Sequence, residues 1–194
     1  MEKVSGQPLG AFLKARIFDP LGMTRTALDD GREIVPHRAM GYDRRVEETP
    51  GYINTRTISM SVPFAAGAMR STVPDLLTWG DALTHGRVLG PDSYREMTTP
   101  ARLSDGASAY VLAPDGTRYP VSYGLGIAVP EGTNPRKLGH DGAIDGFTAT
   151  LTIYPDQDVM VALAANTSPS EHLPIVGVIA AVEAELVEPA PGDR

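Results

Sequence analysis

A hairpin pattern near the C-terminal end constrains the fold of this chain more than any other feature. Residues 147–154 read Phe-Thr-Ala-Thr-Leu-Thr-Ile-Tyr, a β-branched and aromatic run that is typical of strands. Residues 155–158 supply turn residues, and residues 159–165 form a second apolar run. We therefore predict an antiparallel hairpin, so that part of the core must be built on a sheet.

Other segments predict further strands beside this hairpin. Residues 119–129 and 137–143 have strand-like composition, and Pro114-Asp115-Gly116 is typical of a hairpin turn. We expect 119–129, 137–143 and the two hairpin strands to be adjacent and antiparallel. Residues 24–66 show little periodicity, which predicts a long irregular excursion over the surface.

Helical patterns flank the predicted strands. Apolar residues spaced three to four apart over 9–17 predict a helix that Pro20 ends. Thr72 is a good N-cap, with Asp75 at the capping-box spacing, and shorter helical signals follow over 91–97 and from Pro174. The fold class is therefore α/β of the α+β type, an antiparallel sheet flanked by helices. We expect one domain over 1–187 and a flexible tail over 188–194.

Composition excludes several classes of function. The 194 residues carry a formal charge of −7 with a pI near 5.0, which argues against a nucleic-acid partner. The absence of cysteine excludes disulfides and thiolate chemistry and leaves the compartment open. No apolar run is long enough to span a membrane as a helix, and the histidines lack metal-ligand spacing, so we expect neither a membrane span nor a metal site.

The nonapeptide GHDGAIDGF at 139–147 gathers an imidazole, two carboxylates and three glycines ahead of the hairpin. Taken alone, it indicates a glycine-rich turn at the entry to a strand. Asp141 and Asp145 are typical of acids that bond to nearby backbone in turns rather than of a paired acid and base.

Six segments, however, follow one another in a characteristic order. They are Ser5-Gly6, Phe18-Asp19-Pro20-Leu21-Gly22-Met23-Thr24-Arg25-Thr26, Ala66-Gly67-Ala68-Met69-Arg70-Ser71-Thr72-Val73-Pro74-Asp75-Leu76, Tyr123-Gly124-Leu125-Gly126, GHDGAIDGF and Ala164-Ala165-Asn166-Thr167. This ordered set resembles the later half of the serine β-lactamase-related family, which includes class C β-lactamases, D-alanyl-D-alanine carboxypeptidases, D-aminopeptidases and related esterases. The resemblance implies a β-lactamase/transpeptidase-like fold, incomplete on its N-terminal side.

The resemblance also implies an acyl-transfer site built from three motifs, Ser-x-x-Lys, Tyr-x-Asn and Lys-Thr-Gly or its His-x-Gly variant. His140-Asp141-Gly142 matches the third motif. His140 would present a polar group to the substrate, Gly142 would let the acyl group approach the backbone, and the Ala143 N–H would be one oxyanion-hole donor. The family implies no cofactor, and a small-molecule or peptide substrate containing an amide, β-lactam or ester bond.

The nucleophile motif is absent from the sequence. None of the three lysines, Lys3, Lys14 and Lys137, has a serine three residues before it. The family's order places Ser-x-x-Lys before the segment matched by Ser5-Gly6, so we expect a truncated or mis-started chain that is inactive alone. Tyr52-Ile53-Asn54 fits Tyr-x-Asn, but it follows Pro-Leu-Gly-Met, on the wrong side of that order, and we interpret it as a chance match.

Two functional hypotheses remain. The first is a segment of a penicillin-recognising-type serine hydrolase that acts through an acyl-serine. The alternative is a non-catalytic remnant that binds a peptide or partner, with homo-association through an exposed sheet edge.

Overall fold

A three-stranded antiparallel sheet forms the centre of the molecule. The computed structural model describes residues 1–45, 51–168 and 175–187, so the expected tail over 188–194 lies outside the described residues. The sheet has the order β7-β8-β9, formed by β7 (Leu138–Ile144), β8 (Phe147–Tyr154) and β9 (Val159–Ala165). The predicted hairpin is confirmed, and its register places Leu151 opposite both His140 and Ala162.

The prediction for 119–129 is wrong in part. Strands β5 (Ala109–Leu112) and β6 (Arg118–Val121) form a separate two-stranded sheet around the expected turn at Gly116. Residues 122–129 form a tight loop whose backbone pairs with the central sheet through one bridge, between Ala128 and Gly139. Extended pairing stops here because Gly126 adopts a φ of 76°, in the left-handed region.

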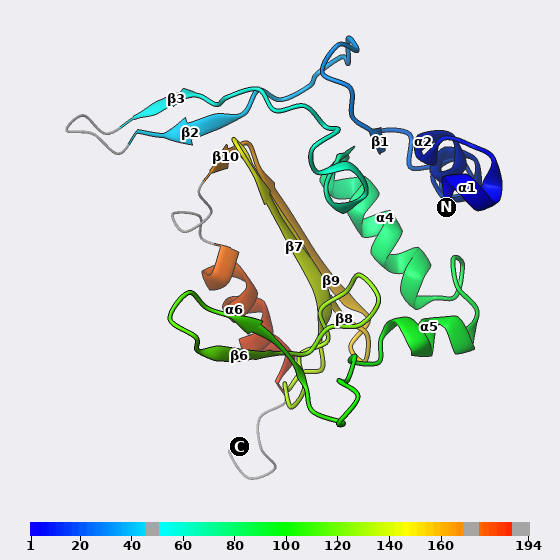
Figure 1. Cartoon of the computed structure of the whole chain (residues 1–194), viewed down its shortest axis with the longest axis vertical. Coiled ribbons are helices and arrows are strands. Elements are labelled where there is room, and N and C mark those ends of the chain that lie inside the picture. The colour runs from blue at the N-terminus through cyan, green and yellow to red at the C-terminus, as the bar shows by residue number, and fades with distance from the viewer. Residues whose placement is uncertain (46–50, 169–174, 188–194) are drawn as a thin grey trace.

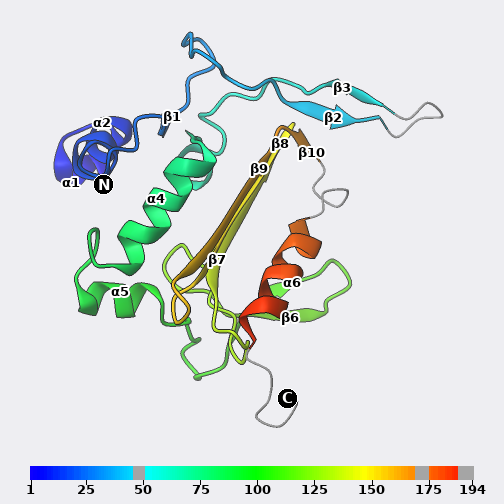
Figure 2. The ribbon, with the colours of Figure 1, turned by 180° about the vertical axis from the view of Figure 1, so that it is seen from behind.

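Two helices cover opposite faces of the central sheet, which Figures 1 and 2 show edge-on. On one face lies α4 (Val73–Thr84), and on the other lies α6 (Ile175–Leu186). The shorter α5 (Pro91–Met97) follows α4. All three agree with the sequence prediction. The sheet is therefore the middle layer of three in this part of the chain.

The main hydrophobic core lies between α4 and the sheet. Its buried members are Leu83, Ile127, Leu138 and Ile153, and Trp79, Leu89, Tyr94, Met97, Val129, Leu151 and Met160 pack around them. Helix and sheet approach closely at Gly80, where an added Cβ would lie 2.8 Å from the Met160 sulfur. This packing fixes α4 against β8 and β9.

The N-terminal helical region runs further than predicted. It comprises α1 (Glu2–Ser5), α2 (Leu9–Leu13), the π-helix η1 (Lys14–Phe18) and α3 (Asp19–Leu21). Pro20 does not end the helix, because it directly follows the wider π turn, in which the Asp19 N–H bonds to the Lys14 carbonyl. The helix instead ends at Gly22, which has a φ of 71°.

The excursion over 24–66 contains more structure than expected. It carries β1 (Ala27–Leu28), β2 (Tyr42–Arg44), β3 (Tyr52–Asn54) and the 3-10 turn η2 (Phe64–Ala66). Strand β1 pairs with β4 (Met69–Arg70), and β10 (Thr167–Ser168) pairs in parallel with β2. Strands β2 and β3 form an arm that extends beyond the end of the central sheet (Figure 1). Among the described residues, no helix has the length and apolar character needed to cross a membrane.

Candidate active site

Strand β7 presents part of its backbone at an edge of the central sheet. Gly139 exchanges two backbone hydrogen bonds with Ala128, at N–O distances of 2.7 and 3.1 Å, so its backbone groups point away from β8. Along an unbroken antiparallel ladder this orientation repeats at every second residue. The register of β7 is continuous, so the N–H groups of Asp141 and Ala143 also point outward, beyond the single bridge to Ala128. An outward N–H can donate to a substrate oxygen.

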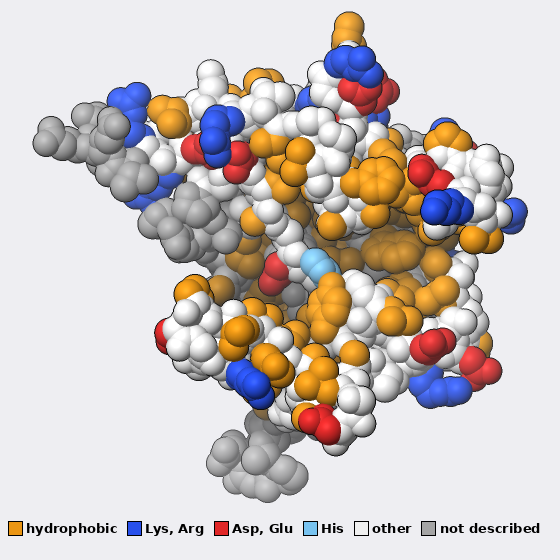
Figure 3. All heavy atoms as spheres, viewed as in Figure 1, with side chains coloured by type: hydrophobic (Ala, Val, Ile, Leu, Met, Phe, Trp, Pro, Cys, Tyr) orange, Lys and Arg blue, Asp and Glu red, His pale blue; other side chains and the backbone are white. Residues whose placement is uncertain are grey.

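The imidazole of His140 lies at the same edge. Its Nε2 is 2.7 Å from the hydroxyl oxygen of Tyr123, and the two rings meet edge to face at a centroid distance of 5.8 Å. His140 is exposed. The space-filling view shows a hollow lined mostly by hydrophobic side chains on one face of the molecule (Figure 3).

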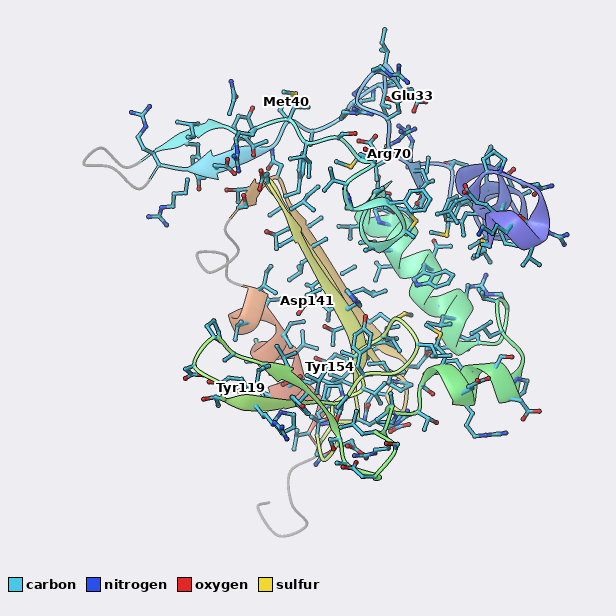
Figure 4. The ribbon with its side chains drawn as sticks, viewed as in Figure 1. Glu33, Met40, Arg70, Tyr119, Asp141 and Tyr154 are labelled. Atoms are coloured by element: carbon cyan, nitrogen blue, oxygen red, sulfur yellow. The ribbon has the colours of Figure 1, made fainter. Side chains whose placement is uncertain are left out.

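Strand alternation separates His140 from Asp141. His140 lies opposite Leu151 and shares the sheet face that α4 covers. Asp141 points to the opposite face, toward α6 (Figure 4), where its carboxylate accepts a hydrogen bond from the Thr150 hydroxyl. Asp145 lies in the β7–β8 turn and pairs with Arg56 at 3.4 Å. The two acids therefore lie apart and do not form an acid–base pair, as the sequence interpretation held. The backbone contacts expected for them are replaced by side-chain partners, Thr150 for Asp141 and Arg56 for Asp145.

Gly142 leaves space beside His140. A Cβ added to Gly142 would meet no atom within 4 Å, whereas a Cβ at Gly139 would lie 2.5 Å from the Leu151 carbonyl oxygen. The two glycines of β7 thus have different reasons to lack a side chain. Gly139 is required by packing within the sheet, and Gly142 keeps the approach to the backbone of β7 open.

A polar cluster holds the far end of β7 against the β2–β3 arm. The Ser168 hydroxyl donates to Asp43 at 2.7 Å and accepts from the Gly146 N–H at 2.8 Å, and the Thr55 hydroxyl also donates to Asp43, at 2.9 Å. The hydrogen bond from Ser168, aided by Thr55 and opposed by partial burial, lowers the pKa of the Asp43 carboxyl. This cluster fixes the turn that directly follows Ala143 and Ile144.

A second concavity lies behind β7, on the α6 face. It has a volume of about 350 Å³ between the sheet and α6, and at its margin Glu183 accepts hydrogen bonds from Lys137 at 2.7 Å and from Tyr154 at 3.2 Å. Lys137 lowers the pKa of Glu183. Burial, followed by the charge of Glu183, raises the pKa of Tyr154 to about 12. These contacts attach α6 to the sheet (Figure 4).

The structure separates Tyr52 from His140. Tyr52 lies on β3 in the projecting arm, with 66% of its surface exposed, whereas the hydroxyl that contacts His140 belongs to Tyr123. Sequence reasoning assigned no role to Tyr123, although it begins the segment Tyr123-Gly124-Leu125-Gly126 that formed part of the family pattern. Within the described part of the chain, no three His, Asp or Glu residues cluster as metal ligands would.

Comparison with known proteins matches this chain to one protein family and to hydrolases of related sequence. The family model described as Beta-lactamase matches residues 1–184. The chain is 28% identical over 176 residues to the unguisins hydrolase of Aspergillus campestris, covering 89% of this chain and 32% of that protein. It spans about a third of the length of the curated relatives it matches.

Solved structures share the fold. A D-stereospecific amidohydrolase from Streptomyces superposes with a TM-score of 0.67 at 29% identity, covering 86% of this chain and 46% of that chain. The D-amino acid amidase of Ochrobactrum anthropi, in complex with L-phenylalanine amide, gives a TM-score of 0.72 at 26% identity, covering 94% and 51%. Both place the chain in the β-lactamase/transpeptidase fold.

Proposed function

Because this chain belongs to the beta-lactamase family, we propose that the edge of β7 is one wall of an acyl-serine hydrolase site. His140, Gly142 and the N–H of Ala143 form this wall. The observation that carries the proposal is the outward-facing N–H of Ala143 on the strand that also presents His140 and the open space at Gly142.

Each member of the wall has a distinct task. The Ala143 N–H donates to the oxyanion that develops when a nucleophile attacks the substrate carbonyl, and one such donor accounts for about 10²–10³ in rate. Gly142 lets the acyl group lie against β7. His140 supplies a positioned polar group to the substrate or to the base network.

The nucleophile and its lysine base come from polypeptide outside these 194 residues. The sequence contains no Ser-x-x-Lys, and a serine hydrolase that lacks its nucleophile loses most of its rate enhancement. The isolated chain therefore forms no acyl-enzyme. Reading the coding DNA upstream of Met1 for an in-frame Ser-x-x-Lys tests this point directly.

The substrate in this proposal is a small molecule or peptide that contains an amide bond. The amidase and amidohydrolase named among the structural neighbours support amides over esters and β-lactams. The test is a panel of D- and L-amino-acid amides, chromogenic esters and a cephalosporin, assayed with the protein completed by its Ser-x-x-Lys portion. Faster turnover of esters or of the cephalosporin than of every amide would contradict this preference.

Two variants of the completed protein test the wall itself. His140→Ala should lower turnover by about 10- to 1000-fold, the range expected for one positioned polar group, and Gly142→Val should lower it at least as much. His85→Ala is the matched control, because His85 is also partly exposed but ends α4 beside Asp81. If His140→Ala behaves like His85→Ala, β7 is not a wall of the site.

Strand addition is the alternative function, and one observation favours it. Strand β9 lies at the other edge of the central sheet and reads Val-Met-Val-Ala-Leu-Ala-Ala, without a charged residue. Charges commonly protect exposed edge strands from pairing with other chains. Concentration-dependent dimerisation that Val161→Lys or Leu163→Lys abolishes would support this module, provided that the completed protein also fails to bind a fluorophosphonate probe.

A further inference from the structure

The contact between Tyr123 and His140 has a chemical consequence for the wall. We propose that Tyr123 is a positioning residue that holds neutral His140 in the tautomer with its proton on Nδ1. His140 then offers the site a hydrogen-bond donor, Nδ1–H, to a carbonyl or carboxylate oxygen of the substrate. This inference rests on the proposed function of His140 in the wall.

The backbone around Tyr123 is held firmly enough to fix its hydroxyl. The Tyr123 carbonyl accepts from the Ala101 N–H at 2.8 Å, and the Leu125 N–H donates to the Met97 carbonyl at 2.9 Å. Gly124 lies so close to the Met97 carbonyl oxygen that no side chain fits there. The loop 122–129 is therefore anchored to the end of α5 as well as to β7 through Ala128.

The anchored loop brings the phenol to one particular nitrogen of His140. The 2.7 Å separation between the hydroxyl oxygen and Nε2 is a good hydrogen-bond length. Among the described residues, Nδ1 of His140 has no hydrogen-bond partner. Nδ1 is thus the ring nitrogen that remains for a substrate.

The direction of this hydrogen bond follows from the chemistry of the two groups. A phenol is a better donor than acceptor because its oxygen lone pair is delocalised into the ring, and a bare imidazole nitrogen is a good acceptor. The O–H of Tyr123 therefore donates to Nε2 in the neutral pair, which leaves the ring proton on Nδ1. When the imidazole is protonated, the hydroxyl rotates and accepts from Nε2–H, so the ring keeps its orientation in both charge states.

The test is nitrogen-15 NMR of the His140 ring in this chain, recorded at alkaline pH where the ring signals no longer change. We expect the Nδ1–H tautomer to predominate in the wild type. Tyr123→Phe should lower the ratio of Nδ1–H to Nε2–H by about two- to tenfold, the range that one net hydrogen bond supports. Tyr119→Phe is the matched control, since Tyr119 lies on β6 with 57% of its surface exposed and should leave the ratio unchanged.

Two results would overturn the inference. One is a predominant Nε2–H tautomer in the wild type, and the other is an unchanged ratio in Tyr123→Phe. If Tyr123→Phe does not fold, the reciprocal measurement replaces it. His140→Ala should shift the carbon-13 signal of Tyr123 Cζ, and an unshifted signal would overturn the inferred hydrogen bond between Tyr123 and His140.

The NMR measurement needs no turnover, so it separates this inference from the proposed function. A wild-type Nδ1–H tautomer that depends on Tyr123 supports the inference. If His140→Ala then leaves turnover of the completed protein unchanged, the function proposed for β7 fails while the role of Tyr123 stands.

Discussion

Neighbouring residues of β7 meet very different surroundings. His140 contacts the Tyr123 hydroxyl, Asp141 accepts from Thr150 on the other face, and Gly142 faces open space. This separation follows from the two-residue period of a strand, which sends adjacent side chains to opposite faces. A His-x-Gly spacing therefore keeps the imidazole and the space beside it on one face and sends the intervening acid to the other.

The two glycines of β7 give the first prediction. Gly139→Ala should lower the free energy of unfolding by about 1–3 kcal/mol, because the new Cβ would lie 2.5 Å from the Leu151 carbonyl oxygen. Gly142→Ala meets no atom within 4 Å and should leave stability unchanged or raise it by up to about 1 kcal/mol. Urea denaturation of the two variants measures the contrast, and equal losses would contradict the described register.

Tyr154 gives a prediction at alkaline pH. Its pKa is raised to about 12 in the folded chain, compared with about 10 in an unfolded chain. The contribution of protonated Tyr154 to the free energy of unfolding is therefore fully present below pH 10. It is lost as the pH rises toward 12, by about 2–3 kcal/mol in total. Thermal unfolding between pH 9 and 11.5 should show this loss in the wild type and a shallower slope in Tyr154→Phe. The exposed Tyr119→Phe should keep the wild-type slope, and identical slopes in all three proteins would contradict the burial of Tyr154.

The sequence was informative about some site residues and silent about others. His140 and Gly142 could be proposed as candidate site residues because they lie in one contiguous motif. Tyr123 and Ser168 could not, because their contacts join segments that only the folded chain brings together: Tyr123 reaches His140 across a tight loop, and Ser168 reaches Asp43 from β10. The outward direction of the Ala143 N–H likewise depends on which edge of β7 pairs with β8.

At the scale of elements, regular patterns were predictable and irregular ones were not. Strands β8 and β9 and helices α4, α5 and α6 agree with their apolar periodicity and caps. The strand expected over 119–129 is divided into β6 and a loop. Its first part, β6, pairs with β5, which lies outside the central sheet. The helix expected to end at Pro20 continues because a π turn precedes the proline, and no periodicity signals that turn.

Helix α4 gives a prediction that concerns the attachment of the N-terminal helices. Its first-turn residue Asp75 is buried, and its carboxylate accepts from the Thr26 hydroxyl at 2.7 Å and from the Arg25 N–H at 3.0 Å. Asp75→Ala should lower the free energy of unfolding by about 2–3 kcal/mol, because these buried donors lose a charged acceptor. Asp92→Ala, at an exposed first-turn position of α5, should change it by less than about 0.5 kcal/mol.

The outcome for Asp75 separates two roles for the same residue. If Asp75→Ala and Asp92→Ala have equally small effects in chemical denaturation, Asp75 stabilises α4 no more than an exposed first-turn acid does through the helix dipole. A large loss for Asp75 alone supports the contact between α4 and the segment that follows α3.

At the scale of the whole molecule, the central sheet separates two surfaces with different tasks. The face under α4 holds the main core and His140, whereas the face under α6 holds Asp141 and the Lys137–Glu183–Tyr154 contacts. The β7 edge of the central sheet carries the outward N–H of Ala143. In the function that we propose, the chain supports one wall of the site, and the acyl-serine chemistry needs a nucleophile from elsewhere.

The most direct test of this account is mass spectrometry for a covalent adduct after exposure to a fluorophosphonate and to a penicillin. The account predicts no adduct on the 194-residue chain. It predicts one adduct on the protein completed with its Ser-x-x-Lys portion, located on that serine, and slower labelling in His140→Ala and Gly142→Val. An acyl or phosphonyl adduct on the 194-residue chain by itself, or labelling of the completed protein that both variants leave unchanged, would contradict it.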